Sequence, residues 1–465
     1  MDSRHRTASA VTLRQVAAAA AVTALMVAAP PVVAQQDRVV AFTHVGVLPM
    51  DTDRVVADQT VVVQGGRITA MGPTTSTDIP NGAFRVDGRG KFLMPGLAEM
   101  HGHVPDADAE DYAEDVLFLY VANGALTVRG MQGHPWHLDL RGRVDSGELV
   151  GPRLHLSSPP LSGNTAPDAA TAERLVREHE AAGYDLLKVH EGLGTEAYAA
   201  IARTASELDL MWGGHVPNDV GLEGALAAKQ TTIDHLDNYI DAIERDDSPI
   251  RDAPPDQRAG LPLYADAAKI PDVARRTREA GVAVVPTMAL WEVLRGGHDA
   301  ATMRDRSELR YMPPQVVSSW IERVDRTRAN TERATAEAEM RVRKQILKAL
   351  HDEGATILMG TDAPQVFSVP GFSLHREMQV MVDAGMTPYE VLRTGTVAIA
   401  EHFGTQADAG TVAPGKQADL LLLDANPIDD IANAGRIAGV MLRGRWLSRT
   451  ELDQRLAAIA AKHGN

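Results

Sequence analysis

The chain has 465 residues, more than one small hydrophobic core can organise, which indicates a large domain with an appendage or two to three domains. Hydrophobic residues make up 44% of the chain and charged residues 23%, values that exclude wholesale disorder. The formal net charge of −16 disfavours binding to nucleic acid or to anionic lipid, so neither partner is expected. Because the chain contains no cysteine, thiolate metal sites, disulfides and a lipid-anchored lipoprotein are excluded.

The first 34 residues have the pattern of a targeting segment. Arg4, Arg6 and Arg14 precede an apolar stretch of small residues, and the stretch ends in "VVAQQ". The sequence therefore predicts a signal peptide over residues 1–34, cleaved after Ala34, and an exported protein that is periplasmic or secreted and has no membrane contact after cleavage. An uncleaved anchor is the alternative, although the apolar core is short for a transmembrane span.

Two β-rich segments flank a long central region. Residues 35–92 and 410–465 contain short β-branched runs divided by Gly, Asp and Pro. We expect these two segments to close into one small β-sandwich built from both chain ends, with a helix at the C-terminus. In residues 93–409, short apolar runs alternate with Ala-rich amphipathic segments, which indicates parallel strands joined by helices.

Eight apolar runs in the central region are strand candidates, and eight β-α units predict an α/β fold, the (β/α)8 TIM barrel. Extra residues at 247–260 and 291–320 would lengthen the loops after the sixth and seventh strands. The polar run 323–354 is expected to be one solvated helix that leads into the eighth strand. The strand candidates are 92–101, 124–130, 153–158, 184–190, 210–216, 231–236, 282–288 and 355–362.

Candidate metal ligands stand at the ends of five of these runs. The pair His101 and His103 is a weak signal by itself: residues i and i+2 of a strand share a face, but such pairs also occur on ordinary surfaces. The other candidates lie at further strand ends, where barrel enzymes place their chemistry. Six such residues at five strand ends are hard to obtain by accident, so we expect a metal site. The set is His101, His103, Lys188, His215, His235 and Asp362.

The chain resembles the amidohydrolase superfamily, and within it the imidazolonepropionase-like and Xaa-Pro dipeptidase-like (prolidase-like) branch of exported enzymes. The resemblance rests on "MPGLAEMHGHV", "YDLLKVHEGL", "GGHVPN", "IDHLDN" and "MGTDAP" in this order, followed by "GTVAPGKQADLLLLDANP". It implies two divalent metal ions, usually zinc, although cobalt or manganese could replace zinc. In that pattern His101, His103 and Asp362 hold the buried α metal, His215 and His235 hold the β metal, and Lys188 bridges them as N6-carboxylysine.

The resemblance also implies a reaction, the hydrolysis of a C–N amide bond in a dipeptide of the Xaa-Pro type or in an N-acyl amino acid. A hydroxide that bridges the metals would attack the carbonyl, and Asp362 would be the general acid/base. Cyclic amides, lactones and phosphotriesters remain open, because the same hydroxide attacks them. Deamination is disfavoured, because Asn218 stands where deaminases of the superfamily typically have a glutamate. A non-catalytic exported metal or ligand binder is the alternative from another class.

Five further residues are candidate substrate contacts. His190 lies two residues beyond the candidate lysine, and His375 could meet a substrate carboxylate. Arg129 is a possible anion binder, although Gly130 replaces the acidic residue that relatives commonly have next to it. The predicted substrate contacts are His190, His375, Arg129, Asn238 and Tyr239.

The long loops carry weaker signals. Trp291 lies in the loop after the seventh strand and is a candidate lid residue. Gln365 is a further candidate near the site, with an equally weak basis in the sequence. The loops at 240–265 and 291–325 contain no motif that identifies a substrate beyond a small-molecule amide or dipeptide. The oligomeric state is equally open, and a homo-oligomer is compatible with the sequence.

Overall fold

The computed structural model of the protein describes residues 38–254, 257–296 and 300–464. The predicted signal peptide and its cleavage site lie outside the described residues. Within the described ranges, every helix is either too short or too polar to cross a membrane.

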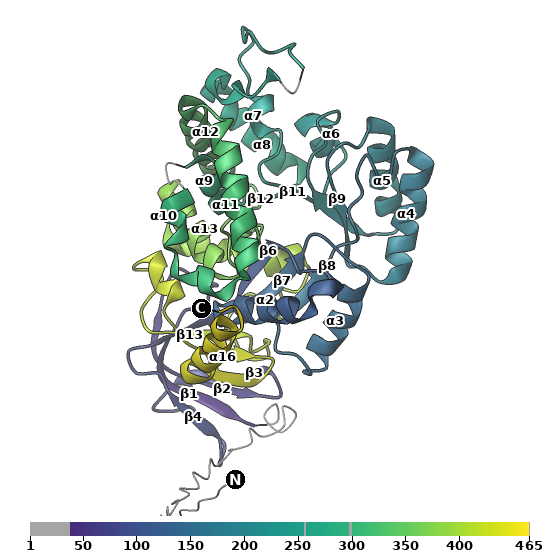
Figure 1. Cartoon of the computed structure of the whole chain (residues 1–465). Coiled ribbons are helices and arrows are strands. Elements are labelled where there is room, and N and C mark those ends of the chain that lie inside the picture. Colours follow the sequence, from purple (N-terminus) through teal and green to yellow (C-terminus); the bar gives the residue numbers. More distant parts are fainter. Residues whose placement is uncertain (1–37, 255–256, 297–299, 465) are drawn as a thin grey trace, which may run out of the picture. The chain divides into compact units, whose positions relative to one another are not determined.

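The small β domain forms from both ends of the described chain, as expected (Figure 1). Its strands make one eight-stranded sheet in the order β15-β14-β13-β5-β1-β2-β3, with β4 paired to β1. Val61, Leu93, Leu420 and Met441 belong to its buried core, so residues far apart in sequence share one apolar cluster. The strands are β1 (Val40–Val47), β2 (Val56–Gln64), β3 (Arg67–Pro73), β4 (Phe84–Asp87), β5 (Phe92–Pro95), β13 (Leu420–Leu423), β14 (Ile437–Leu442) and β15 (Arg445–Ser448).

The first strand candidate, 92–101, proves to be two strands that belong to different sheets. β5 pairs with β1 and β13 in the small domain, whereas β6 (Leu97–Gly102) pairs with β7 (Ala125–Gly130). Gly96 stands at the junction, where a Cβ atom would lie 2.6 Å from the side chain of Leu126. Only glycine allows this close approach, so the chain passes from one sheet to the other at that residue.

Parallel strands form the barrel that positions the candidate site. One sheet has the order β6-β7-β8 and another the order β12-β11-β10-β9. Bridges from Ser157 to Leu186 and from Leu161 to Val189 join the two sheets on one side. The remaining strands are β8 (Arg153–Leu156), β9 (Leu186–Val189), β10 (Met211–Gly214), β11 (Thr232–Asp234) and β12 (Ala283–Val285).

The eighth strand candidate closes the ring without forming a regular strand. It makes a parallel bridge to β12 through Ile357 and one to β6 through Ala363. Backbone hydrogen bonds run from Leu358 to Val284 and from Met100 to Met359, each 2.9 Å long. Both sheets are thus joined at this second edge too, which confirms the barrel.

Helices follow the barrel strands, and a few helices of the chain begin at a side-chain cap. Asp168 accepts the backbone N–H of Thr171 at the start of α4 (Ala169–Ala182), and Gly183 ends that helix at a φ of 90°. Ser448 and Glu451 form a capping box at the start of the expected C-terminal helix, α16 (Arg449–Lys462). The helices around the barrel are α2 (Glu110–Ala122), α3 (Trp136–Asp145), α4 (Ala169–Ala182), α5 (Thr195–Glu207), α6 (Gly221–Ala227), α8 (Ile270–Ala280), α13 (Phe372–Asp383), α14 (Pro388–Thr394) and α15 (Val397–His402).

Helices lie within the predicted insertion 291–320 and on both sides of the predicted insertion 247–260. The segment after β11 holds α7 (Tyr239–Ala242), η3 (Leu261–Tyr264) and η4 (Ala267–Lys269). The segment after β12 holds α9 (Met288–Arg295), α10 (Ala300–Arg304), η5 (Ser307–Tyr311) and α11 (Pro314–Ala329). The two segments follow the carboxyl ends of β11 and β12, the end of a barrel where insertions affect a site most directly.

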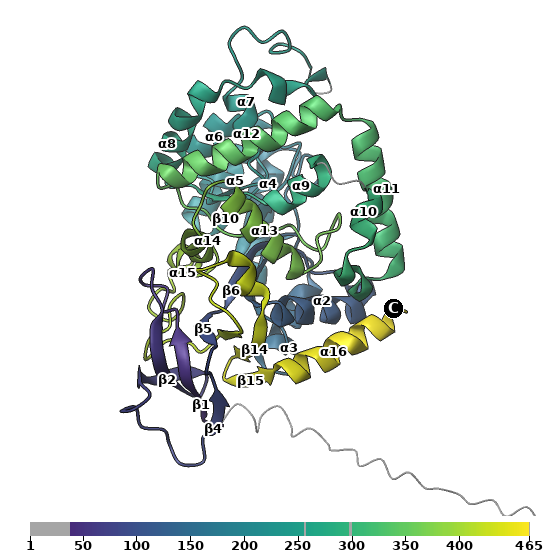
Figure 2. The same cartoon turned by 90° about the vertical axis from the view of Figure 1, so that its left-hand side faces the viewer.

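The polar run 323–354 is not the single solvated helix that its sequence predicts. α11 ends at Ala329, and α12 (Arg333–Asp352) starts after a short break (Figure 2). α12 packs against α8 and α9 and buries Val342 and Ile346 together with the charged residues Glu339 and Arg343. Although its sequence is mostly polar, one face of α12 is buried and contains the ion pair between Glu339 and Arg343.

Candidate active site

The six predicted metal ligands come together at the carboxyl ends of the barrel strands. They arise from β6, β9, the ends of β10 and β11, and the segment that closes the ring. Parallel strands of a barrel point their carboxyl ends to one rim, which is why side chains distant in sequence meet there. All six line one cavity of about 700 Å³: His101, His103, Lys188, His215, His235 and Asp362.

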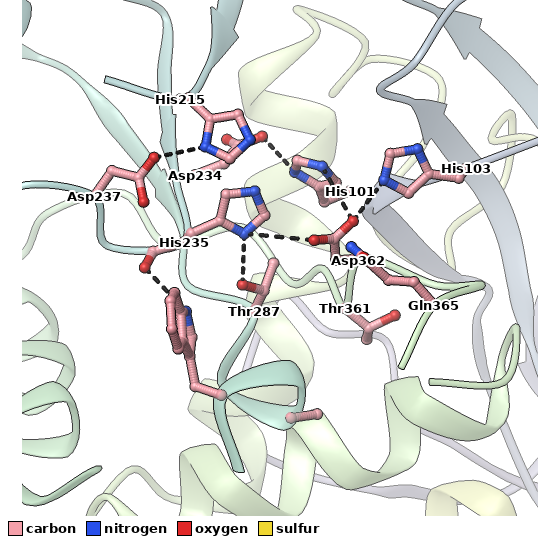
Figure 3. A network of polar contacts seen from close by, with 12 residues as sticks. His101, His103, His215, Asp234, His235, Asp237, Thr287, Thr361, Asp362 and Gln365 are labelled. Atoms are coloured by element: carbon pink, nitrogen blue, oxygen red, sulfur yellow. Dashed lines mark hydrogen bonds and ion pairs between the residues drawn. The ribbon is translucent and has the colours of Figure 1, made fainter. Parts of the chain in front are cut away.

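One group of donors is compact enough to hold a metal ion. Nε2 of His103 lies 2.5 Å from Oδ1 of Asp362, and Nε2 of His101 lies 3.5 Å from the same oxygen (Figure 3). One ligand atom from each of these three residues lies within 4.8 Å of the other two. Two imidazoles and a carboxylate are a donor set that zinc and similar divalent ions accept.

His101 is oriented from behind by a buried ion pair. Its Nδ1 lies 2.6 Å from Oδ2 of Asp234, and Arg129 donates to both oxygens of that carboxylate at 2.9 and 3.1 Å. Burial and the charge of Lys188 lower the pKa of His101 to about 3, so the ring is neutral. With Nδ1 engaged by the carboxylate, Nε2 is left to offer its lone pair to the cavity.

His215 and His235 form the second half of the cluster, with ring centroids 4.7 Å apart. Nδ1 of His215 lies 2.8 Å from Oδ2 of Asp237, and Nδ1 of His235 lies 2.9 Å from Oγ1 of Thr287. Each ring thus has one nitrogen engaged by a protein partner, the arrangement that orients histidine ligands. His235 also has a φ of 64°, a left-handed conformation that other contacts must hold in place.

Lys188 lies inside the cluster as an isolated buried amine. Its side chain is buried, Nζ lies 3.4 Å from Nε2 of His101, and burial lowers the pKa of its amine. Within the described residues no carboxylate forms an ion pair with Nζ. Gly214, at a φ of 119°, makes room for it, since a Cβ there would lie 3.2 Å from Nζ.

Asp362 occupies the centre of the site. Burial by itself raises the pKa of its carboxyl group, but the imidazoles of His101 and His103 more than offset this, so the pKa lies below its ordinary value. Glu99 supports the segment that carries it by accepting the backbone N–H and the hydroxyl of Thr361. The carboxylate is therefore ionised and fixed in position, as a metal ligand or a base requires.

The structure places only one of the five predicted substrate contacts on the cavity wall. His190 lines the cavity, with its ring 4.6 Å from that of His215. Arg129 does not, because its guanidinium is buried against Asp234 in the barrel interior. Gly130 replaces the acidic residue that would follow Arg129 in the sequence. Asp234 of β11 supplies a carboxylate to Arg129 instead.

The other three predicted substrate contacts also lie off the wall. The chain turns away after His235, since Asn238 has a φ of 62° and donates its amide to the carbonyl of Val216. Tyr239 is fully buried, and its hydroxyl meets that of Thr277. His375 lies in α13, where burial lowers its pKa to about 4 and Nε2 contacts the carbonyl of Asn123.

Several functional residues escaped prediction from sequence. Asp234 and Asp237 flank His235 within "IDHLDN" and orient His101 and His215. Two acidic residues so close to a candidate ligand are a pattern from which these partners could be predicted. The wall of the cavity gave no such signal. Trp291 and Gln365 do line it, and further wall residues are Tyr112, Gln132, Leu290, Leu294, Val316 and Arg323.

Comparison with known proteins shows the family to which the chain belongs. The model of the amidohydrolase family matches residues 92–447. The crystal structure of a putative prolidase from Bifidobacterium longum superposes with a TM-score of 0.67 at 22% identity, covering 91% of this chain and 99% of that one.

Two curated relatives agree with the match. Ochratoxinase from Aspergillus niger is 23% identical over 468 residues, 86% of this chain and 84% of that protein. Adenine deaminase 3 from Rhizobium meliloti (strain 1021) is 23% identical over 397 residues, 82% of this chain and 55% of that protein, so the chain spans about half the length of this relative. The chain therefore belongs to the amidohydrolase family and is an enzyme of the hydrolases that act on carbon–nitrogen bonds.

Proposed function

We propose that this chain is an exported, binuclear metal-dependent amidohydrolase that cleaves an amide bond in a dipeptide of the Xaa-Pro type or in an N-acyl amino acid. The observation that carries the proposal is the convergence of His101, His103 and Asp362 within 4.8 Å, beside buried Lys188, in one cavity. Export rests on the signal-like pattern of residues 1–34 alone.

The donors fit two divalent ions. His101, His103 and Asp362 would hold one ion, and His215 and His235 the other. The engaged Nδ1 atoms of His101, His215 and His235 support this, because each ring is oriented by a protein partner, as metal ligands are. Zinc suits this set of imidazole and carboxylate donors, and cobalt or manganese would also be accepted.

Lys188 would complete the site as a carbamate. Its neutral amine would form an N–C bond to carbon dioxide and release one proton, which leaves an anionic group with two oxygen donors. The absence of a carboxylate partner for Nζ within the described residues supports this, since a permanent ammonium in this position would lack an ion pair.

The residues around the cavity then divide the reaction among them. Two bound divalent ions would supply acidification of the attacking water and polarisation of the scissile carbonyl. Asp362 accepts the proton of the attacking water and passes it to the nitrogen of the leaving amine. His190, on the wall beside His215, is placed to contact the substrate.

Other substrates of the same chemistry are the second candidate. A cyclic amide, a lactone or a phosphotriester could be attacked in the same cavity. Deamination has less support despite the similarity to adenine deaminase 3. Asn218, three residues after His215, carries an amide that cannot shuttle a proton, and it is exposed and lies outside the cavity wall.

Substitution of Lys188 tests the proposal. We expect Lys188→Ala and Lys188→Arg to hydrolyse a panel of dipeptides and N-acyl amino acids at least about 100-fold more slowly than the wild-type chain. Both variants should also bind fewer than two zinc ions per chain. Arginine keeps the positive charge but cannot form the carbamate. The control is Lys229→Arg, which changes an exposed lysine. If both Lys188 variants keep their activity and two ions, the proposal is wrong.

A further inference from the structure

Trp291 and Arg343 meet behind the candidate ligand His235. The carbonyl oxygen of His235 accepts a hydrogen bond from Nε1 of Trp291 at 3.1 Å and another from Nη1 of Arg343 at 2.7 Å. The guanidinium of Arg343 also lies over the indole, 3.5 Å from the ring centroid. Two donors and a cation–π contact therefore fix the indole to the backbone of a site residue.

Arg343 is itself held by a buried ionic network. Glu339 accepts from Nε and Nη2 of Arg343 at 3.1 and 3.0 Å, and its other oxygen accepts from Nε of Arg295 at 2.7 Å. Arg343 and Glu339 are only 6% and 7% exposed. Burying such charges costs free energy, so a network of this kind is best explained by the geometry that it imposes.

The front of this assembly is apolar and faces the cavity. Trp291 lines the cavity together with Leu290 and Leu294 of α9 and Val316 of α11, whereas Arg343 does not line it. The start of α9 is anchored by Glu377, which accepts the backbone N–H groups of Met288 and Ala289 at 2.9 and 2.6 Å. The cavity thus has a stiff apolar wall beside its polar ligand cluster.

We propose that Trp291 forms a subsite for an aromatic or large aliphatic group attached next to the scissile amide, and that Arg343 is the positioning residue that holds the indole. The inference rests on the proposed function, since it places the amide at the ligand cluster. The substrate class is then an N-acyl amino acid or dipeptide with a bulky apolar group, preferred over its alanine or glycine counterpart. Burial of such a side chain corresponds to a preference of about 10- to 100-fold in kcat/KM.

Two matched substrate pairs test the subsite in the zinc-loaded full chain. N-acetyl-L-phenylalanine against N-acetyl-L-alanine places the ring on the amine side, and N-benzoylglycine against N-acetylglycine places it on the acyl side. We expect a preference for the aromatic member of at least one pair. Trp291→Ala should remove that preference, mainly through KM, and Trp291→Phe should keep most of it. Equal kcat/KM within both pairs, or a preference that survives in Trp291→Ala, overturns the subsite.

Arg343 and a control tryptophan sharpen the test. Arg343→Lys keeps the charge but cannot serve the carbonyl, Glu339 and the ring at once, so we expect the preference to fall about 3- to 10-fold. Zinc content should stay at two per chain, which separates positioning from loss of the site. Trp136→Phe is the control, because its indole lies off the cavity wall and its Nε1 has no partner in the described chain. A full preference in Arg343→Lys would rule out the positioning role.

Failure of the proposed function gives a different result. If the wild-type chain hydrolyses none of the four compounds, hydrolysis of N-acyl amino acids, one of the two proposed substrate classes, is wrong. Binding of intact N-acetyl-L-phenylalanine and N-acetyl-L-alanine is then compared by calorimetry in wild type and Trp291→Ala. Tighter binding of the aromatic compound that is lost in Trp291→Ala supports the subsite, and equal binding of the two compounds contradicts it.

Discussion

The strand-end cluster and the insertion wall are two sides of one cavity, and they are built differently. The cluster takes its side chains from the ends of barrel strands and from the segment that closes the ring, and His101, His215 and His235 are each oriented by a hydrogen bond behind the ring. The wall takes Trp291 and Val316 from helices inserted after β12, and α12 packs behind it. The barrel thus supplies groups for chemistry, and the insertion supplies a surface for selection.

Asp362→Asn should have the largest effect and tests the chemical side of this division. We expect kcat to fall by about 10³-fold or more, because the amide is a poor proton acceptor and a weaker ligand. The loss should be equal for aromatic and small substrates, as measured by steady-state kinetics with zinc content determined in parallel. A loss confined to one class of substrate would break the division.

Metal removal should be nearly as severe and should act on stability too. After dialysis against a chelator we expect hydrolysis to fall to background and the melting temperature to drop, because ions that bind only the folded chain stabilise it by about 2.7 kcal/mol at 100 times Kd. Zinc should restore both quantities. Unchanged activity in protein shown to be metal-free would remove the chemical role of the cluster.

Asp234→Asn tests whether metal binding depends on the buried carboxylate that orients His101. We expect zinc affinity to fall about 10- to 100-fold and the free energy of unfolding to drop by about 3 kcal/mol, because Arg129 would keep a buried charge without its carboxylate. Asp237→Asn is the matched variant, since Asp237 orients His215 from a more exposed position, and it should lose affinity with less destabilisation. Zinc titration and urea unfolding measure both effects, and equal destabilisation by the two variants would contradict the account.

Arg323→Met should have the smallest effect and tests the rim of the insertion. Its exposed guanidinium donates to Oε1 of Gln365 at 3.0 Å on the cavity wall. We expect KM for a carboxylate-bearing substrate to rise less than about 5-fold, because exposed charges are screened, with kcat unchanged. The difference in KM should shrink further at high salt. A large fall in kcat would show that this insertion takes part in the chemistry.

The ligand cluster could be predicted from sequence because its signal is local and repeated. Five of the eight strand candidates end in a candidate ligand such as Lys188 or His235, and parallel strands carry those ends to one rim. The substrate contacts could not be predicted in the same way. Asn238 and Tyr239 follow His235 directly, yet one left-handed turn points them into the protein. Sequence proximity to a site residue therefore does not place a side chain in the cavity.

By itself, the sequence determined the barrel, the small β domain drawn from both chain ends, and the group of residues at the strand ends, because periodicity and strand order are properties of the chain. Only the tertiary structure decided which charges are buried. Glu339 and Arg343, four residues apart, have the pattern of an exposed helix pair. Contact with Trp291 and with the carbonyl of His235 turns that pair into the support of the cavity wall, and such long-range packing has no local signature.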